Sequence, residues 1–296
     1  MNNRQSLSRW KLLTRAGLLL ILNGLTFVVV NALMPSFRPA FPTIPAGEAA
    51  QLPVFLLVYL LIRTAVLVYL IRHLSSPTYG SAVWLALILF GLETVLMQLE
   101  TIWFRSAFPA LSYRNVGIFL MSSLLEKAII VPIAVWLLRP KTSQTTSTQP
   151  FTPGVIGWHR SWLLLALVYV CIYFLLGYLI AWQSPSLRQF YTGSTRLDGF
   201  LTHMLDVDPW LILFQYGRGL GWLVLASLLS HLFTNHRKLF QISIVLIGAV
   251  LIPGALLLPN PLMPEPVRYA HLWELVSSGT LWGWLLGRYV HVKQMG

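Results

Sequence analysis

The chain has 296 residues, of which 56% are hydrophobic and only 10% are charged, and its mean hydropathy is +0.68. A soluble domain usually carries about 25% charged residues, so this composition excludes an ordinary soluble protein and indicates a membrane protein. The single cysteine, Cys171, excludes an intramolecular disulfide and a cysteine-rich metal site.

The first half of the chain, residues 1–138, contains four apolar runs that are long enough to cross a bilayer. A basic segment, residues 1–16, precedes the first run. We interpret that run as an uncleaved helix, because it is longer than the core of a signal peptide. Pro132 predicts a kink in the fourth helix. The expected helices cover residues 17–34, 52–71, 82–104 and 116–138.

A Ser/Thr-rich stretch, residues 139–160, follows and has the composition of a flexible cytoplasmic linker. In the second half, residues 161–296, apolar residues recur with helical spacing near residues 197–206, which predicts a short amphipathic helix in the external membrane interface. The expected spanning helices cover residues 162–182, 210–231, 239–258 and 266–289. The predicted fold class is therefore all-α, a polytopic membrane bundle of about eight transmembrane helices.

The two halves share a pattern of charge. The second helix of each half has one central arginine, Arg63 or Arg218, and the fourth has one central glutamate, Glu126 or Glu274. An even number of helices in each half would relate them by an axis along the membrane normal. We therefore consider a 4+4 parallel pseudo-repeat as a hypothesis.

Positive charge is concentrated in one set of loops. With a cytoplasmic N-terminus, 12 of the 21 lysines and arginines fall in cytoplasmic segments, five in external loops and four inside the apolar runs. Because such an excess marks the cytoplasmic side, we predict a multi-pass protein of the plasma or inner membrane with both termini cytoplasmic. The net charge of +12 then faces anionic lipid. Membrane lipid is the expected partner, and nucleic acid is not needed to explain the charge.

Eight charged side chains fall inside the apolar runs. Four are cations and four are carboxylates, which is the balance that buried charges require. Glu93 and Glu100 share one helical face, which should point toward the bundle interior or a water-filled cavity. For Arg63 and Arg218 we expect Glu93 and Glu126 as the buried partners. The eight residues are Arg63, Glu93, Glu100, Glu126, Lys127, Arg218, Arg268 and Glu274.

Most of these groups would lie near the middle or in the outer half of the membrane, which indicates a polar site open to the external side. Three arginines would bind an anion, three glutamates would orient them or carry protons, and His271 would exchange a proton. The candidate binding residues are Arg63, Glu93, Gln98, Glu100, Glu126, Gln215, Arg218, Arg268, His271 and Glu274.

His271 and Glu274 also have a spacing that occurs in metal sites, and nearby glutamates could supply further ligands. The neighbouring arginines would repel a metal cation. We therefore expect neither a metal nor a cofactor. The motifs H-E-x-x-H, G-x-S-x-G and G-x-x-x-x-G-K-[ST] are absent.

These features favour the binding or transport of a small anionic or polar solute, or of a lipid headgroup. Two alternatives stay open. The protein could be a membrane-embedded enzyme acting on a lipid-linked substrate, with His271 or a glutamate as the general acid or base. It could also be a structural membrane subunit whose buried charges only fix helix packing.

Overall fold

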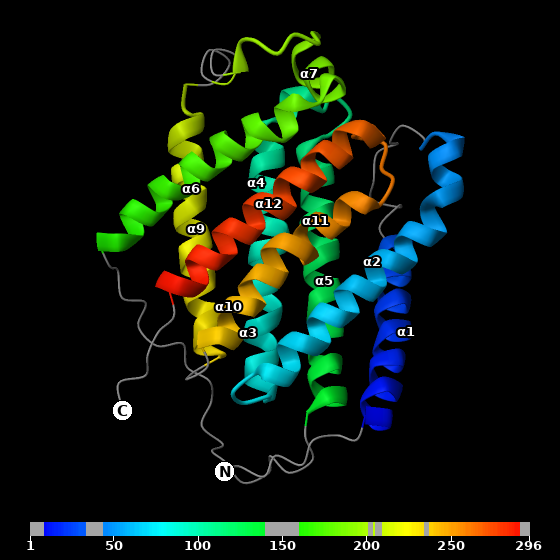
Figure 1. Cartoon of the computed structure of the whole chain (residues 1–296). Coiled ribbons are helices and arrows are strands. Elements are labelled where there is room, and N and C mark those ends of the chain that lie inside the picture. The colour runs from blue at the N-terminus through cyan, green and yellow to red at the C-terminus, as the bar shows by residue number, and fades with distance from the viewer. Residues whose placement is uncertain are drawn as a thin grey trace.

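The computed structural model describes residues 9–33, 44–139, 160–200, 204, 209–233 and 237–290 (Figure 1). This part of the chain is almost entirely helical and contains no strand, which confirms the all-α class. The long uninterrupted helices are α1 (Arg9–Leu33), α2 (Ala46–His73), α5 (Tyr113–Leu138), α6 (Arg160–Leu179), α9 (Leu211–His231) and α12 (Glu265–Tyr289). Helix α1 begins inside the basic segment, earlier than expected, and α5 continues through Pro132.

Seven of the described helices are long and apolar enough to cross a membrane. Helix α12 has 25 residues, but its polar residues keep it outside this set. A polytopic bundle is therefore confirmed, whereas the number of eight spans stays a prediction. The seven segments are Arg9–Leu33, Ala46–His73, Tyr79–Trp103, Tyr113–Leu138, Ser161–Gln183, Leu211–His231 and Arg237–Leu257.

The third and seventh expected helices are both interrupted by a π-helical segment. Such segments are rare and occur frequently at functional sites. The third comprises α3 (Tyr79–Phe90), the π segment η2 (Gly91–Val95) and α4 (Leu96–Trp103). The seventh comprises α10 (Arg237–Leu246), the π segment η6 (Ile247–Leu251), α11 (Ile252–Gly254) and the 3₁₀ turn η7 (Ala255–Leu257). Pro253, which lacks a backbone donor, lies within α11 and helps to explain why the regular helix ends there.

The two halves of the chain have similar internal packing. Helix α1 packs on α2 and α5 as α6 packs on α9 and α12, and α3 packs on α5 as α10 packs on α12. Between the halves, α2 contacts α10, α3 contacts α9, and η2 contacts η6. The backbone N–H of Ser75 also donates to the carbonyl of Leu232, at 2.9 Å, and so links the α2–α3 connection to the end of α9. These reciprocal contacts are those expected of a parallel repeat, which itself stays a prediction.

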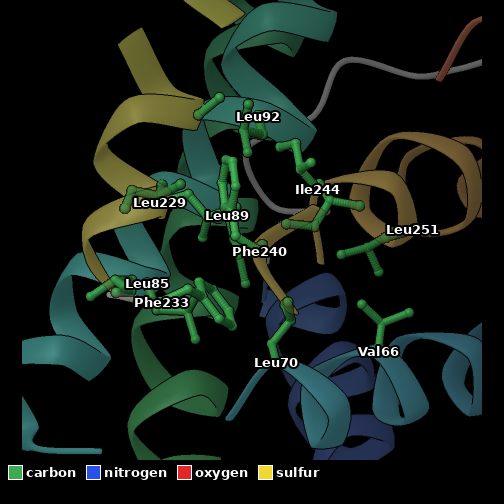
Figure 2. Close-up of a cluster of buried hydrophobic side chains, with 14 of the residues drawn as sticks. Val66, Leu70, Leu85, Leu89, Leu92, Leu229, Phe233, Phe240, Ile244 and Leu251 are labelled. Atoms are coloured by element: carbon green, nitrogen blue, oxygen red, sulfur yellow. The ribbon is translucent and has the colours of Figure 1, made fainter. Parts of the chain in front are cut away.

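The main hydrophobic core lies where α2, α3, α9 and α10 meet. Figure 2 shows Leu70 of α2, Leu89 of α3 and Phe240 of α10 gathered with their neighbours, and all three are buried. The outer faces of α1 and α6 instead expose large apolar side chains such as Ile21 and Leu164. Because a bilayer can cover such surfaces, this inside-out distribution agrees with a membrane location.

Helix α12 approaches α10 and η6 through a row of glycines. Gly279, Gly283 and Gly287 recur every four residues on one side of α12. An added Cβ at Gly279 would collide with the carbonyl group of Gly248, and one at Gly283 would lie 2.9 Å from the Cα of Val245. Small residues at this spacing let two membrane helices approach closely, so these glycines fix where α12 lies.

A short helix covers one end of the bundle. Helix α7 (Pro185–Thr192) begins after Ser184, whose side chain accepts a hydrogen bond from the backbone N–H of Leu187, and it ends at Gly193, with φ of +70°. Figure 1 shows α7 above the ends of α4 and α12. Of the amphipathic helix expected near residues 197–206, residues 197–199 are not helical, Phe200 and Met204 are helical, and the other five residues lie outside the described ranges. Most of the expected linker at 139–160 also lies outside them.

Candidate functional site

A cavity of about 870 Å³ lies beneath α7. Its walls come from α4, α6, α7, α9 and α12, and the loop after α4 contributes residues 106–109 at its outer end. Glu93 of η2, Gly248 of η6 and Gly279 of α12 lie in its deeper part. The cavity therefore occupies the end of the bundle opposite the α2–α3 connection, and its position depends on both π segments and on the glycine contact of α12.

Arg218 of α9 forms an ion pair with Glu100 of α4 at one wall of this cavity, with 2.7 Å between Nη2 and Oε2. The Nε group of Arg218 donates to the carbonyl of Leu96 at 3.0 Å, and Nη1 donates to Oε1 of Gln215 at 3.2 Å. The guanidinium is buried, and each of its three nitrogens has a protein acceptor. It thus fastens α9 to α4.

His271 of α12 lies between a carboxylate and a phenol. Its Nδ1 is 2.9 Å from Oε2 of Glu274, one turn along the same helix, and its Nε2 is 3.1 Å from the hydroxyl of Tyr191 on α7. When Nδ1–H donates to Glu274, Nε2 of the neutral ring accepts from Tyr191. Burial, followed by the nearby Glu100 and Glu274 carboxylates, raises the pKa of Tyr191, so its hydroxyl stays a proton donor. The contact between Tyr191 and His271 therefore connects α7 to α12.

Glu93 forms the deep boundary of the cavity. Its Oε2 lies 3.2 Å from Nζ of Lys127 on α5, and Lys127 donates to the hydroxyl of Ser123 at 2.9 Å. That hydroxyl is also 2.5 Å from the hydroxyl of Thr94, the residue after Glu93. Helix α5 therefore holds η2 by an ion pair and a pair of hydroxyl groups.

A second group of charged side chains lies on the side of Glu93 that faces away from the cavity, and it encloses almost no empty space. Arg63 of α2 pairs with Glu126 of α5, and its guanidinium lies over the ring of Tyr59, 5.4 Å from the centroid. Arg63, Glu93 and Lys127 line a void of only about 10 Å³ there, which is the lower limit for one water molecule. Glu93 lines both spaces, so it separates the cavity from this inner group.

A fourth ion pair between a basic side chain and a glutamate joins α2 and α12 away from the cavity. Nη2 of Arg268 lies 2.5 Å from Oε2 of Glu48. The expected helix at 52–71 began after Glu48, but in the structure Glu48 lies in the first turn of α2. Helix α2 begins earlier than its apolar run suggests because its first turn can carry an acidic residue, which the helix dipole favours there.

The structure brings together six of the ten candidate residues around the cavity: Glu93, Gln98, Glu100, Arg218, His271 and Glu274. Gln215 lies directly behind, fully buried against Arg218 and Glu100. Arg63, Glu126 and Arg268 belong to ion pairs that do not line the cavity.

Of the two glutamates expected as partners, Glu126 does pair with Arg63, which confirms a buried carboxylate partner for that arginine. The pairing of Arg218 with Glu93 or Glu126 is wrong, since Arg218 pairs with Glu100 and Glu93 pairs with Lys127. Arg218 lies next to α4 rather than next to η2 or α5, and sequence position along separate helices does not define that relative depth.

Sequence reasoning missed the aromatic walls. Eleven of the 35 lining residues are aromatic, although aromatic residues make up only 13% of the chain. Tyr169 and Tyr173 of α6 lie one turn apart, and the rings of Tyr169 and Trp282 are 5.1 Å apart. The i, i+4 spacing of the two tyrosines was a signal of a shared face, but it could not show what that face met.

Within the described ranges, no group of three or more histidine, cysteine or acidic side chains is arranged to hold a metal ion. The charged residues that line the cavity instead belong to separate pairs: Arg218 with Glu100, Glu93 with Lys127, and His271 with Glu274. No protein-family model, curated protein or solved structure matches this chain.

Proposed function

We propose that this membrane protein binds a small polar molecule, or the headgroup of a lipid, in the cavity beneath α7. We further propose that the protein transports this ligand across the membrane. The observation that supports the proposal is the difference in volume between two spaces. The cavity beside Glu100 and Glu274 has a volume of about 870 Å³, whereas the void beside Arg63 has a volume of about 10 Å³. Pockets for small molecules have volumes of about 300–1,000 Å³, with mainly apolar walls and a few polar groups.

Charges that only hold helices together need no such space, as the pair of Arg63 and Glu126 illustrates. Polar groups inside membrane bundles that face a cavity commonly mark the path of a substrate or ion. The rings of Tyr169 and Trp282 pack against each other in the cavity wall and supply apolar surface for such a ligand.

The proposal includes an orientation. The ends of helices that carry Arg72, Arg139, Arg237 and Arg288 lie opposite α7, and an excess of basic residues favours the cytoplasmic side. The cavity would then open outward. Reporter fusions after Gln149 and Gly193 are expected to lie on opposite sides of the membrane, and the same side for both would contradict this orientation.

A cavity-filling variant tests the binding itself. Leu275 lines the cavity on α12, whereas Leu281 on the same helix is 40% exposed and does not line it. Native mass spectrometry of the purified protein is expected to show a co-purifying small molecule or lipid. Leu275→Trp should reduce its occupancy, and Leu281→Trp, the matched control, should not. Equal occupancy in both variants would contradict ligand binding in this cavity.

One observation favours a second candidate, an enzyme. His271 lies between Glu274 and Tyr191 at the cavity wall, and a carboxylate that orients an imidazole is a common arrangement in general acid–base catalysis. Turnover of a lipid-linked substrate by the wild type and its loss in His271→Ala, with ligand occupancy retained, would support this candidate.

A further inference from the structure

The charges that face the cavity are predominantly negative. Three carboxylates line it, those of Glu93, Glu100 and Glu274, against one arginine, Arg218, and one histidine, His271. Lys127 pairs with Glu93 but does not line the cavity. Even with Lys127 counted, three carboxylates face only two fixed cations, Arg218 and Lys127. When the His271 ring is neutral, the remaining negative charge attracts a cation by Coulomb's law.

The positive groups are also occupied by protein acceptors. Arg218 directs its three nitrogens to Leu96, Gln215 and Glu100. Both ring nitrogens of His271 have partners in Glu274 and Tyr191. An anionic ligand would have to displace these contacts, and breaking a buried charge pair is costly.

Two of the three carboxylates have an oxygen atom that accepts no hydrogen bond from the described part of the protein. The ion pairs of Glu93 and Glu274 each use Oε2. Over the described chain, neither second oxygen receives a hydrogen bond from the protein. An ionised carboxylate accepts at both oxygens, so a bound cation would find an open acceptor at Glu274 without displacing His271.

The walls favour an organic cation rather than a metal ion. Aromatic rings attract cations through their faces, and Tyr173 lines the same cavity as Glu100 and Glu274. Tyr169, Tyr173 and Trp282 also supply apolar surface, which would solvate a bare inorganic ion poorly but suits an ammonium or phosphonium group carrying hydrocarbon.

We infer, on the basis of the proposed function, that the ligand is a lipophilic organic cation, such as a quaternary ammonium or a protonated amine. Its charge lies near the open oxygen of Glu274, and its apolar body lies against the rings of α6 and α12. This differs from the anion that the arginines suggested, because the structure shows those arginines neutralised by protein carboxylates.

Two probes of nearly equal size and opposite charge test the inference. Tetraphenylphosphonium and tetraphenylborate differ mainly in the sign of their charge. With purified protein in a neutral detergent, radiolabelled tetraphenylphosphonium is expected to bind saturably and tetraphenylborate is not. Saturable binding of the borate alone would overturn the inference and leave the proposed function standing. If neither probe binds, the inference is overturned, and the occupancy test with Leu275→Trp decides the proposed function separately.

Substitutions at the cavity wall test whether the cation binds beside Glu274. Glu274→Gln should weaken phosphonium binding roughly tenfold or more, because a buried opposite charge is removed. Glu265→Gln makes the same change on the same helix outside the cavity and serves as the control. Equal affinities for these two variants would overturn the placement. Should Glu274→Gln fail to fold, the aromatic wall gives a second readout: Tyr173→Leu should weaken binding more than Tyr173→Phe does, since only phenylalanine retains an aromatic face.

A third arm distinguishes a soluble cation from a lipid amine. Phosphonium binding is measured in nanodiscs of phosphatidylglycerol and again with half of the lipid replaced by phosphatidylethanolamine. Competition by phosphatidylethanolamine supports a headgroup amine as the natural cation, and unchanged affinity supports a soluble one.

Discussion

The inner pair of Arg63 and Glu126 and the outer pair of Arg218 and Glu100 have the same chemistry but different surroundings. Each joins two membrane helices, and both arginine side chains are almost fully buried. The carboxylate of Glu126 is 11% exposed and that of Glu100 is 24% exposed, because only the latter faces the large cavity. Two arginine–glutamate pairs of the same chemistry can therefore differ in whether they adjoin a cavity, and it is the cavity beside Glu100 that makes the outer pair a candidate for ligand binding.

Glu93 lies at the boundary between these regions. Glu93 lines both the cavity and the small inner void, and it belongs to the π segment η2. The second π segment, η6, contacts η2 and supplies Gly248 to the cavity wall. Both interruptions thus occur where the packed inner part of the bundle meets the cavity.

The largest loss of stability is expected from breaking the inner pair. Arg63→Gln or Glu126→Gln should each cost about 3–5 kcal/mol, because the remaining charge would be buried without a partner. The double variant should recover part of that loss. Unfolding in detergent measures both, and strictly additive losses would contradict the contact.

The glycine contact of α12 should give the next largest effect. Gly279→Ala is expected to destabilise the protein by about 1–3 kcal/mol, because the added methyl group would overlap the backbone of Gly248. Gly217→Ala on α9 is the control, since nothing lies within 4 Å of its added Cβ. It should be neutral or slightly stabilising. Similar losses for both variants would argue against the close approach of α12 and η6.

The outer pair should contribute less to stability than the inner pair. Arg218→Gln is expected to cost about 1–3 kcal/mol, because water in the cavity can solvate the remaining Glu100 carboxylate. The same unfolding experiment as for Arg63→Gln makes the comparison direct. A loss equal to that of Arg63→Gln would remove the distinction between the two regions.

The smallest effect is expected at Tyr191. Tyr191→Phe removes one hydrogen bond to His271, worth about 0.5–1.5 kcal/mol, and should speed amide exchange mainly in α7. Since burial raises the pKa of Tyr191, its contribution is fully present below pH ~10, the ordinary tyrosine value, and is lost as pH rises from there toward the higher folded-state pKa. Alkaline pH should therefore destabilise the wild type more than Tyr191→Phe, and equal losses would contradict this role.

Much of the fold could be predicted because apolar length and periodicity determine membrane helices. The eight long helices expected from apolar length correspond to observed helical segments, and a glutamate partner for Arg63 followed from the need to neutralise buried charge. The row of Gly279, Gly283 and Gly287 was also present in the sequence as a packing signal, but it went unused.

The cavity could not be predicted, because it depends on how separate helices align. Sequence does not give the relative depth of α9 and α4, so the partner of Arg218 was missed. The π segments have no composition that distinguishes them from α-helix, and the contact of Tyr191 with His271 joins residues 80 positions apart. Helix α7 had recognisable local signals in Ser184, Pro185 and Gly193.

The most direct test measures unfolding stability and tetraphenylphosphonium affinity on the same purified variants, Glu126→Gln and Glu274→Gln. Both changes remove one buried carboxylate charge, but only Glu274 lines the cavity. Glu126→Gln should lower stability and leave the affinity of the folded protein unchanged, whereas Glu274→Gln should lower affinity about tenfold with the smaller loss of stability. Affinity losses that follow the stability losses in both variants would contradict the division between a structural inner pair and a binding cavity.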